Sequence, residues 1–201
     1  MDKAGTVLRA GALWGMALAA TAFADGSGNR LGNGDFSRGL AEWTVRFPEP
    51  NETKYARNHL WVDTVENPLG EGVVARFSLN RSVAASEGVK ASTPLLPVEP
   101  GVAYEFGADI LSEEPTAKVI LEGYVEDAER TARGADQIPG FRRIYRAVIH
   151  PKGVSGSVWT SHRRRIAPPS RHQPTHVLVK LYAYWPEGKI FYDNVFLREA
   201  E

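Results

Sequence analysis

The sequence predicts an all-β protein built as a single β-sandwich of two antiparallel sheets. Several short segments alternate between apolar and polar residues with a period of two, the pattern of strands that bury one face. The chain has 19 glycines and 13 prolines, and they are spread between these segments as turn residues. No segment has the periodicity of an amphipathic helix, and no internal repeat is found. Many short strands with frequent turns favour a sandwich, because a half-apolar sheet needs a second sheet to cover it.

Residues 1–24 are predicted to be a secretory signal peptide. Lys3 and Arg9 give a positive start, residues 10–20 form an uncharged apolar run, and residues 22–24 (Ala-Phe-Ala) have the small-x-small pattern of a cleavage site. An uncleaved membrane anchor is the alternative, but it needs about 20 apolar residues, more than this run supplies. We therefore expect a protein without an integral membrane span that is secreted, periplasmic or on the cell surface.

The remainder of the chain has the length of one domain with a sizeable core. A flexible lead is expected over residues 25–28, and the sandwich over residues 29–199. The sequence contains no cysteine, which excludes disulfides, thiolate metal sites and a cysteine nucleophile. The core must therefore hold the fold together, either alone or with a structural metal.

The predicted strands follow one another along the chain. They are residues 73–79, 103–111, 118–125, 144–149, 158–166, 176–184 and 190–197. In the segment 176–184, alternation gives a core face of Val177, Val179, Leu181 and Ala183 and an opposite face of Leu178, Lys180, Tyr182 and Tyr184. The turn residues 185–188 (Trp-Pro-Glu-Gly) then predict a hairpin between the last two strands.

Three short motifs resemble a known family. Residues 33–36 (NGDF), followed by Gly39 and Leu40 and then Trp43, resemble the opening NGDFE-x-GL-x-x-W of the carbohydrate-binding modules of families 4, 9, 16 and 22. Residues 98–106 (VEPGVAYEF) resemble the family's V-x-PG-x-x-Y-x-F segment, and residues 192–197 (YDNVFL) are similar to its closing YxDDVxL strand. The motifs occur in the family's order, so the resemblance implies a galactose-binding-like jelly roll.

The resemblance implies a non-catalytic module that binds a polysaccharide or oligosaccharide on the concave face of one sheet or on its rim loops. Aromatic rings suit this role because the C–H faces of a sugar pack on them, while hydroxyls need fixed donors and acceptors. The candidates are Tyr182, Tyr184, Trp185, Trp61 and Trp159. The alternative for the tyrosines is cover for a half-exposed sheet, and for Trp185 packing over its own turn. Trp43 is left out because the resemblance makes it a core residue.

Two charged residues complete the candidate sugar site. Glu122 lies on the polar face of the predicted strand 118–125, and Lys180 shares a face with Tyr182 and Tyr184. If both strands belong to the concave sheet, Glu122 can bind sugar hydroxyls. Otherwise it is a solvated strand carboxylate.

The resemblance also implies a structural calcium ion, held by the aspartate of the last strand and by oxygens of the opening segment. Asp193 matches that aspartate. The opening motif, however, has Ser37 where the family has a carboxylate ligand, so that Asp35 or backbone carbonyls would have to substitute. Because Ca²⁺ prefers several carboxylate and carbonyl oxygens, this change weakens the expectation.

Charge is balanced in total, with 24 Lys and Arg against 24 Asp and Glu, but it is unevenly distributed. Residues 137–186 contain no acid at all. The cations there are Arg142, Arg143, Arg146, Lys152, Arg163, Arg164, Arg165, Arg171 and Lys180. One interpretation is that strands of the two halves interleave and their charges pair. The other is a basic groove for an anionic glycan, since the arginine fork suits carboxylates and sulfates. Nucleic acid is not expected for an exported protein.

Two further functions stay open at this stage. One is a structural or adhesive envelope protein that binds a protein partner, which an exposed apolar patch would favour. The other is a polysaccharide lyase acting on an anionic glycan, which requires a Tyr or His beside two arginines in a groove. The glycan and the oligomeric state are not predicted.

Overall fold

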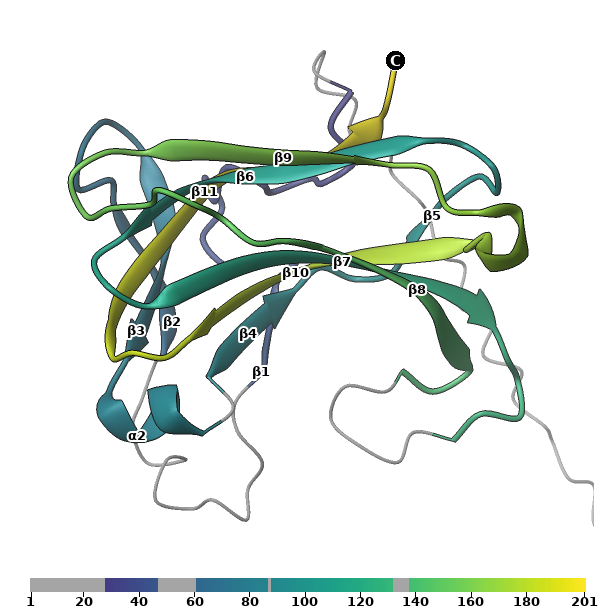
Figure 1. Cartoon of the computed structure of the whole chain (residues 1–201), viewed down its shortest axis with the longest axis horizontal. Helices are drawn as coiled ribbons and strands as arrows, with labels where there is room; N and C mark the ends of the chain where they lie inside the picture. Colours follow the sequence, from purple (N-terminus) through teal and green to yellow (C-terminus); the bar gives the residue numbers. More distant parts are fainter. Residues whose placement is uncertain (1–27, 47–60, 87, 132–137) are drawn as a thin grey trace, which may run out of the picture.

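The computed structural model describes residues 28–46, 61–86, 88–131 and 138–201. The predicted signal peptide and most of the predicted lead therefore lie outside the described residues. The described chain is built almost entirely of strands, which form two antiparallel sheets packed face to face (Figure 1). The predicted all-β sandwich is confirmed. Among the described residues, no helix has the length and apolar character needed to cross a membrane.

The first sheet, sheet A, has the strand order β1-β4-β10-β7-β8, and β5 pairs with β10 beside this path. Its strands are β1 (Thr44–Arg46), β4 (Val89–Ser92), β5 (Leu96–Pro97), β7 (Thr116–Glu126), β8 (Phe141–Ile149) and β10 (His176–Tyr184).

The second sheet, sheet B, has the order β2-β3-β11-β6-β9. Its strands are β2 (Val62–Glu66), β3 (Val73–Leu79), β6 (Tyr104–Ser112), β9 (Thr160–Ile166) and β11 (Gly188–Glu199). Two short helices, α2 (Arg81–Ala85) and η1 (Ser170–His172), lie between strands. The helix α2 begins where the side chain of Asn80 accepts a hydrogen bond from the Val83 amide at 3.0 Å.

The predicted hairpin between the last two strands is wrong. β10 pairs with β4, β5 and β7 in sheet A, whereas β11 pairs with β3 and β6 in sheet B. The chain crosses from one sheet to the other at the turn after Tyr184, where the Trp185–Pro186 peptide bond is cis. Both strands are central in their sheets, and each is hydrogen-bonded to a neighbour on either side. Neither β10 nor β11 therefore has a free edge with which to pair with the other.

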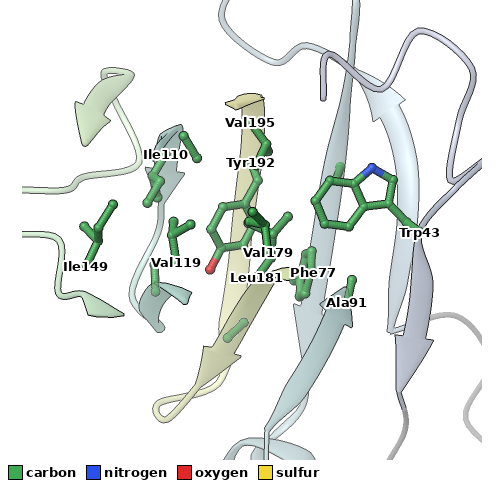
Figure 2. Close-up of a cluster of buried hydrophobic side chains, with 14 of the residues drawn as sticks. Trp43, Phe77, Ala91, Ile110, Val119, Ile149, Val179, Leu181, Tyr192 and Val195 are labelled. Carbon is green, nitrogen blue, oxygen red and sulfur yellow. The ribbon is translucent and has the colours of Figure 1, made fainter. Parts of the chain in front are cut away.

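The core lies between the two sheets, and Figure 2 shows part of it. The predicted inner face of β10 is confirmed, since Val179, Leu181 and Ala183 are completely buried. Opposite them, Tyr192 of β11 is also completely buried, and its hydroxyl donates a hydrogen bond to the Tyr182 carbonyl at 2.8 Å. Burial raises the pKa of the Tyr192 hydroxyl, so this side chain stays neutral and ties sheet B to sheet A.

The opening motif is part of this core, as predicted for Trp43. Its indole packs against the Phe36 ring at 5.3 Å between centroids, and its Nε1 donates to the Asn33 carbonyl at 3.0 Å. Gly34 meets the closing strand, because its carbonyl accepts from the Val195 amide at 2.8 Å. A Cβ at Gly34 would lie 1.9 Å from the Val195 carbonyl oxygen. The opening motif thus packs directly against the closing strand. This close contact requires glycine at position 34.

Candidate functional site

The side of sheet A that points away from sheet B carries most of the candidate residues, and we call it the outer face of sheet A. Alternation along β10 and β7 decides its members. From β10 they are His176, Leu178, Lys180, Tyr182 and Tyr184, and from β7 they are Lys118, Ile120, Glu122 and Tyr124. The predicted shared face of Lys180, Tyr182 and Tyr184 is correct, and the paired register of the two strands brings Glu122 onto the same face.

Glu122 lies at the centre of this face, with an exposed fraction of only 1%. Its Oε2 accepts from the Tyr124 hydroxyl at 2.8 Å and from Lys180 Nζ at 3.1 Å. Its Oε1 accepts from Arg143 Nη1 at 2.6 Å, and Arg146 Nε lies 3.8 Å away. Burial favours the neutral acid, but Lys180, Tyr124 and Arg143 outweigh it and hold the pKa of the carboxyl below its usual value. Glu122 is therefore an ionised carboxylate among three cations.

Because Glu122 and Lys180 are buried as an ion pair, they are not available as direct sugar ligands. Their side chains are almost completely covered, so they do not offer free groups to a sugar hydroxyl. Glu122 instead holds Arg143 by a hydrogen bond and attracts Arg146, and both arginines are about half exposed. The sequence predicts both arginines only as part of a basic segment, because the cross-strand register alone places them beside Glu122.

Tyr182 and Tyr184 form a stacked pair at one end of the same face. Their ring centroids are 5.0 Å apart and their planes differ by 12°. Lys118 Nζ lies 4.4 Å from the Tyr184 ring centroid, and Lys90 Nζ lies 5.5 Å from that of Tyr182. Both rings are half-buried, and the ammonium groups over them add cation–π attraction. The result is a rigid aromatic surface with a cationic rim.

Trp185 follows this pair directly, in the turn between the sheets. Its side chain is 50% exposed, more than any other tryptophan that the structure describes. Its carbonyl accepts hydrogen bonds from the Thr116 amide at 3.2 Å and from the Thr116 hydroxyl at 3.0 Å. The backbone of the turn is thus tied to the start of β7, while the indole stands open to solvent.

Two predicted aromatic candidates lie elsewhere. Trp61 is 7% exposed and packs in the core between the sheets, so it has no ring face for a sugar. Trp159 precedes β9 and packs on the far side of sheet B against a small cluster that contains Leu111 and Phe191. Its Nε1 donates to the Asn67 side chain at 3.1 Å. The structure therefore separates both tryptophans from the tyrosine pair.

The predicted calcium ligands lie near one another but do not form a closed site. Burial raises the pKa of the Asp193 carboxyl to about 6, and the charges of Asp109 and Asp35 add to this rise. Asp35 Oδ1 already accepts from the Ser37 amide at 3.2 Å and from the Ser37 hydroxyl at 3.0 Å. Across the described ranges, no three His, Asp or Glu side chains are grouped to hold a metal. Because Ca²⁺ takes about six to eight oxygens, these residues as placed do not fit the ion.

The residues that a lyase would need are present only in part. Tyr124 and two arginines meet at Glu122, but the Tyr124 hydroxyl donates to that carboxylate and the side chain is buried. His176 lies on the same face, edge-on to Phe141 with ring centroids 5.0 Å apart. The two arginines that a lyase would turn toward a substrate carboxylate lie against Glu122 instead.

No protein-family model and no curated protein matches this chain. Solved structures do match. A family 16 carbohydrate-binding module aligns with a TM-score of 0.53 at 15% identity, over 82% of this chain and 96% of the module. A family 4 module aligns with a TM-score of 0.52 at 8% identity, over 84% of this chain and 98% of the module.

A family 61 module in complex with β-1,4-galactotriose aligns with a TM-score of 0.50 at 17% identity, over 86% of this chain and 99% of the module. The enzymatically active domain of tailspike protein 4 from bacteriophage CBA120 aligns with a TM-score of 0.55 at 15% identity, over 86% of this chain. The match spans only 22% of that tailspike structure. At these identities the likeness concerns the fold, and the chain is a β-sandwich that resembles carbohydrate-binding modules.

Proposed function

We propose that this protein is an exported, non-catalytic module that binds a polysaccharide through the outer face of sheet A. The observation that carries the proposal is the stacked pair of Tyr182 and Tyr184, which shares one face with Glu122 and is followed in the chain by the exposed Trp185. The likeness to carbohydrate-binding modules supports it, since these share the two-sheet architecture. Export is proposed from the signal-like residues 1–24.

The chemistry of this face suits a sugar chain. The exposed indole of Trp185 and the open parts of the tyrosine rings provide apolar surface for the C–H face of a pyranose. Arg143 and Arg146 carry several N–H donors each, and Glu122 holds them in place. Because these donors are fixed before the ligand arrives, little side-chain entropy is lost on binding.

The carboxylates of this face support a role without catalysis. A glycosidase uses two carboxyl groups about 5 to 10 Å apart across one cleft. On β7, the next outer-face carboxylate after Glu122 is Glu126. Four residues along a strand correspond to about 13 Å, which is beyond that range. Glu122 itself is held by three cations and a tyrosine hydroxyl, so it is not placed to act as an acid or base.

A protein partner is the second candidate, and an exposed apolar patch favours it. Leu69 and Val158 are exposed in the loops before β3 and β9, and Val73 is exposed at the start of β3. A hydrogen bond from Trp159 to Asn67 links these two loops. If this patch carries the function, Val158→Asp abolishes capture of an envelope protein while Trp185→Ala does not.

A glycan array tests the main proposal. The purified chain is expected to bind at least one neutral glycan, and Trp185→Ala and Tyr184→Ala are expected to lose that binding. Leu69→Ala is the matched control, because Leu69 is also an apolar turn residue, with an exposed fraction of 48% against 50% for Trp185. If the control loses binding equally, or if no glycan binds, the proposal is wrong.

A further inference from the structure

One open side of the sandwich is formed by two edge strands, β8 of sheet A and β9 of sheet B. The two strands run along the same side in Figure 1. Arg164 of β9 joins them, since its Nη1 donates to the Val148 carbonyl of β8 at 2.7 Å. That bond also occupies an edge carbonyl that would otherwise be open to another strand.

Arginines continue from this side onto both outer faces of the sandwich. Arg143 and Arg146 of β8 lie on the outer face of sheet A, beside Glu122. Arg163 and Arg165 of β9 alternate with Arg164, so they lie on the outer face of sheet B. We call these five residues the arginine edge.

The carboxylates near the arginine edge do not balance it. On sheet A, Glu122 is shared by Arg143, Arg146 and Lys180. One negative charge thus faces three positive charges, so the outer face of sheet A has an excess of positive charge.

On sheet B, Glu105 is bound by Arg198 at 2.6 Å, and Arg163 lies 4.0 Å from its other oxygen. Arg165 is the cross-strand neighbour of the same glutamate. The nearby Asp109 is engaged by Ser161 and by Asn194. These partners are neutral and leave the charge of Asp109 in place, so three arginines lie near two carboxylates on sheet B, and three cations surround one carboxylate on sheet A.

The strands that carry the edge bring no acid of their own, because residues 137–186 contain no Asp or Glu. Within the part of the chain that the structure describes, neither Arg164 nor Arg165 has a carboxylate within 4.0 Å. Arg163 is also 72% exposed. These guanidinium groups keep unused donors in the fork geometry that matches carboxylate and sulfate.

We infer that the arginine edge is a second binding site, which takes the carboxylate or sulfate groups of an acidic polysaccharide. The choice of a glycan rests on the proposed function. Arg143 and Arg146 border both sites, whereas Arg163, Arg164 and Arg165 belong to sheet B and lie away from the tyrosine and tryptophan surface. Arg163 and Arg165 are separated by two residues, about 7 Å along the strand. A linear polyanion lying along β9 therefore meets both guanidinium groups. An acidic chain is preferred over a neutral one because the excess positive charge attracts it.

Binding of polygalacturonate and of heparin, measured by calorimetry at low and high salt, tests the inference. The double variant Arg163→Gln/Arg165→Gln should weaken binding of the preferred polyanion by roughly twofold to thirtyfold, because each exposed ion pair contributes about 0.2–1 kcal/mol. High salt should weaken the wild type in the same direction. Both side chains are exposed, so the thermal midpoint should not change.

The control is Arg38→Gln/Lys189→Gln, which removes the same charge from two half-exposed cations outside β8 and β9. Equal weakening in the control would show a general charge effect and overturn the site. Tighter binding of a DNA duplex than of either glycan would overturn the choice of ligand. Neutral-glycan binding should be unchanged in Arg163→Gln/Arg165→Gln, so failure of the arginine edge is distinguished from failure of the proposed function. If neither polyanion binds, the arginines only protect the sheet edge and the inference is wrong.

Discussion

Replacing Glu122 by glutamine tests whether the charged centre of sheet A is held as described. The substitution keeps the side-chain shape and an acceptor for the Tyr124 hydroxyl, but it leaves the buried ammonium of Lys180 without its counter-charge. Removing one partner of a buried ion pair costs about 3–5 kcal/mol. Arg143 and Arg146 are half exposed, and solvent screens their contribution to well under about 1 kcal/mol each. We expect a loss near the lower end, about 3 kcal/mol.

Urea unfolding at neutral pH measures this loss, and thermal unfolding should show a fall of about 6–12 °C for a domain of this size. The double variant Glu122→Gln/Lys180→Met should recover most of the loss, because it removes the uncompensated cation. A single-variant loss below about 1 kcal/mol would mean that the carboxylate is solvated. That result would refute the buried centre.

The same carboxylate gives a pH dependence of defined sign. The fold lowers the pKa of Glu122 below its usual value of 4.5, so its stabilising effect is fully present above that pH. The effect is lost as the pH falls through the folded-state pKa. The wild type should therefore lose more stability than Glu122→Gln on acidification. An identical acid response in both proteins would contradict this assignment.

Three further substitutions test other parts of the structure. Gly34→Ala should destabilise the domain strongly, because the new Cβ would lie 1.9 Å from the Val195 carbonyl oxygen, and a normal unfolding midpoint would contradict that contact. Tyr192→Phe should cost about 1 kcal/mol in urea unfolding, for the hydrogen bond to the Tyr182 carbonyl; no loss would mean that this bond adds nothing. Asp193→Asn should stabilise the fold above pH 6, since the pKa of Asp193 is raised to about 6, and the gain should shrink as the pH falls and the wild-type carboxyl is protonated. Millimolar Ca²⁺ should leave the thermal midpoint of the wild type unchanged, because Asp193 and Asp35 as placed do not fit the ion; a rise in the wild type that is absent in Asp193→Asn would contradict this.

The sequence predicted the faces of the strands well because alternation is a local property. The period of two along β10 separated buried Val179 and Leu181 from Tyr182 and Tyr184 without knowledge of any partner. The resemblance of the opening motif also predicted that Trp43 is a core residue, and it is buried.

What the sequence could not predict was which strands pair. The turn at residues 185–188 has hairpin chemistry, yet it connects two sheets, because β10 and β11 are both central strands. The same limit misplaced Trp61 and Trp159, which belong to segments of sheet B. Without the strand pairing, the burial of Glu122 could not be predicted either. Its carboxylate is covered because Lys180 and Arg143 reach it from the two neighbouring strands. The expectation that charges of the two halves pair across strands is supported by these contacts.

Quenching of tryptophan fluorescence by iodide, with and without a saturating neutral glycan, tests the central claim most directly. Trp185 is the most exposed tryptophan of the described chain, so it dominates the quenching by a charged, water-soluble reagent. If the glycan lies on the surface of Tyr182, Tyr184 and Trp185, the ligand should protect the fluorescence, and Trp185→Phe should abolish that protection. A glycan that binds at saturation but leaves the iodide quenching of Trp185 unchanged would place the sugar elsewhere and contradict the account.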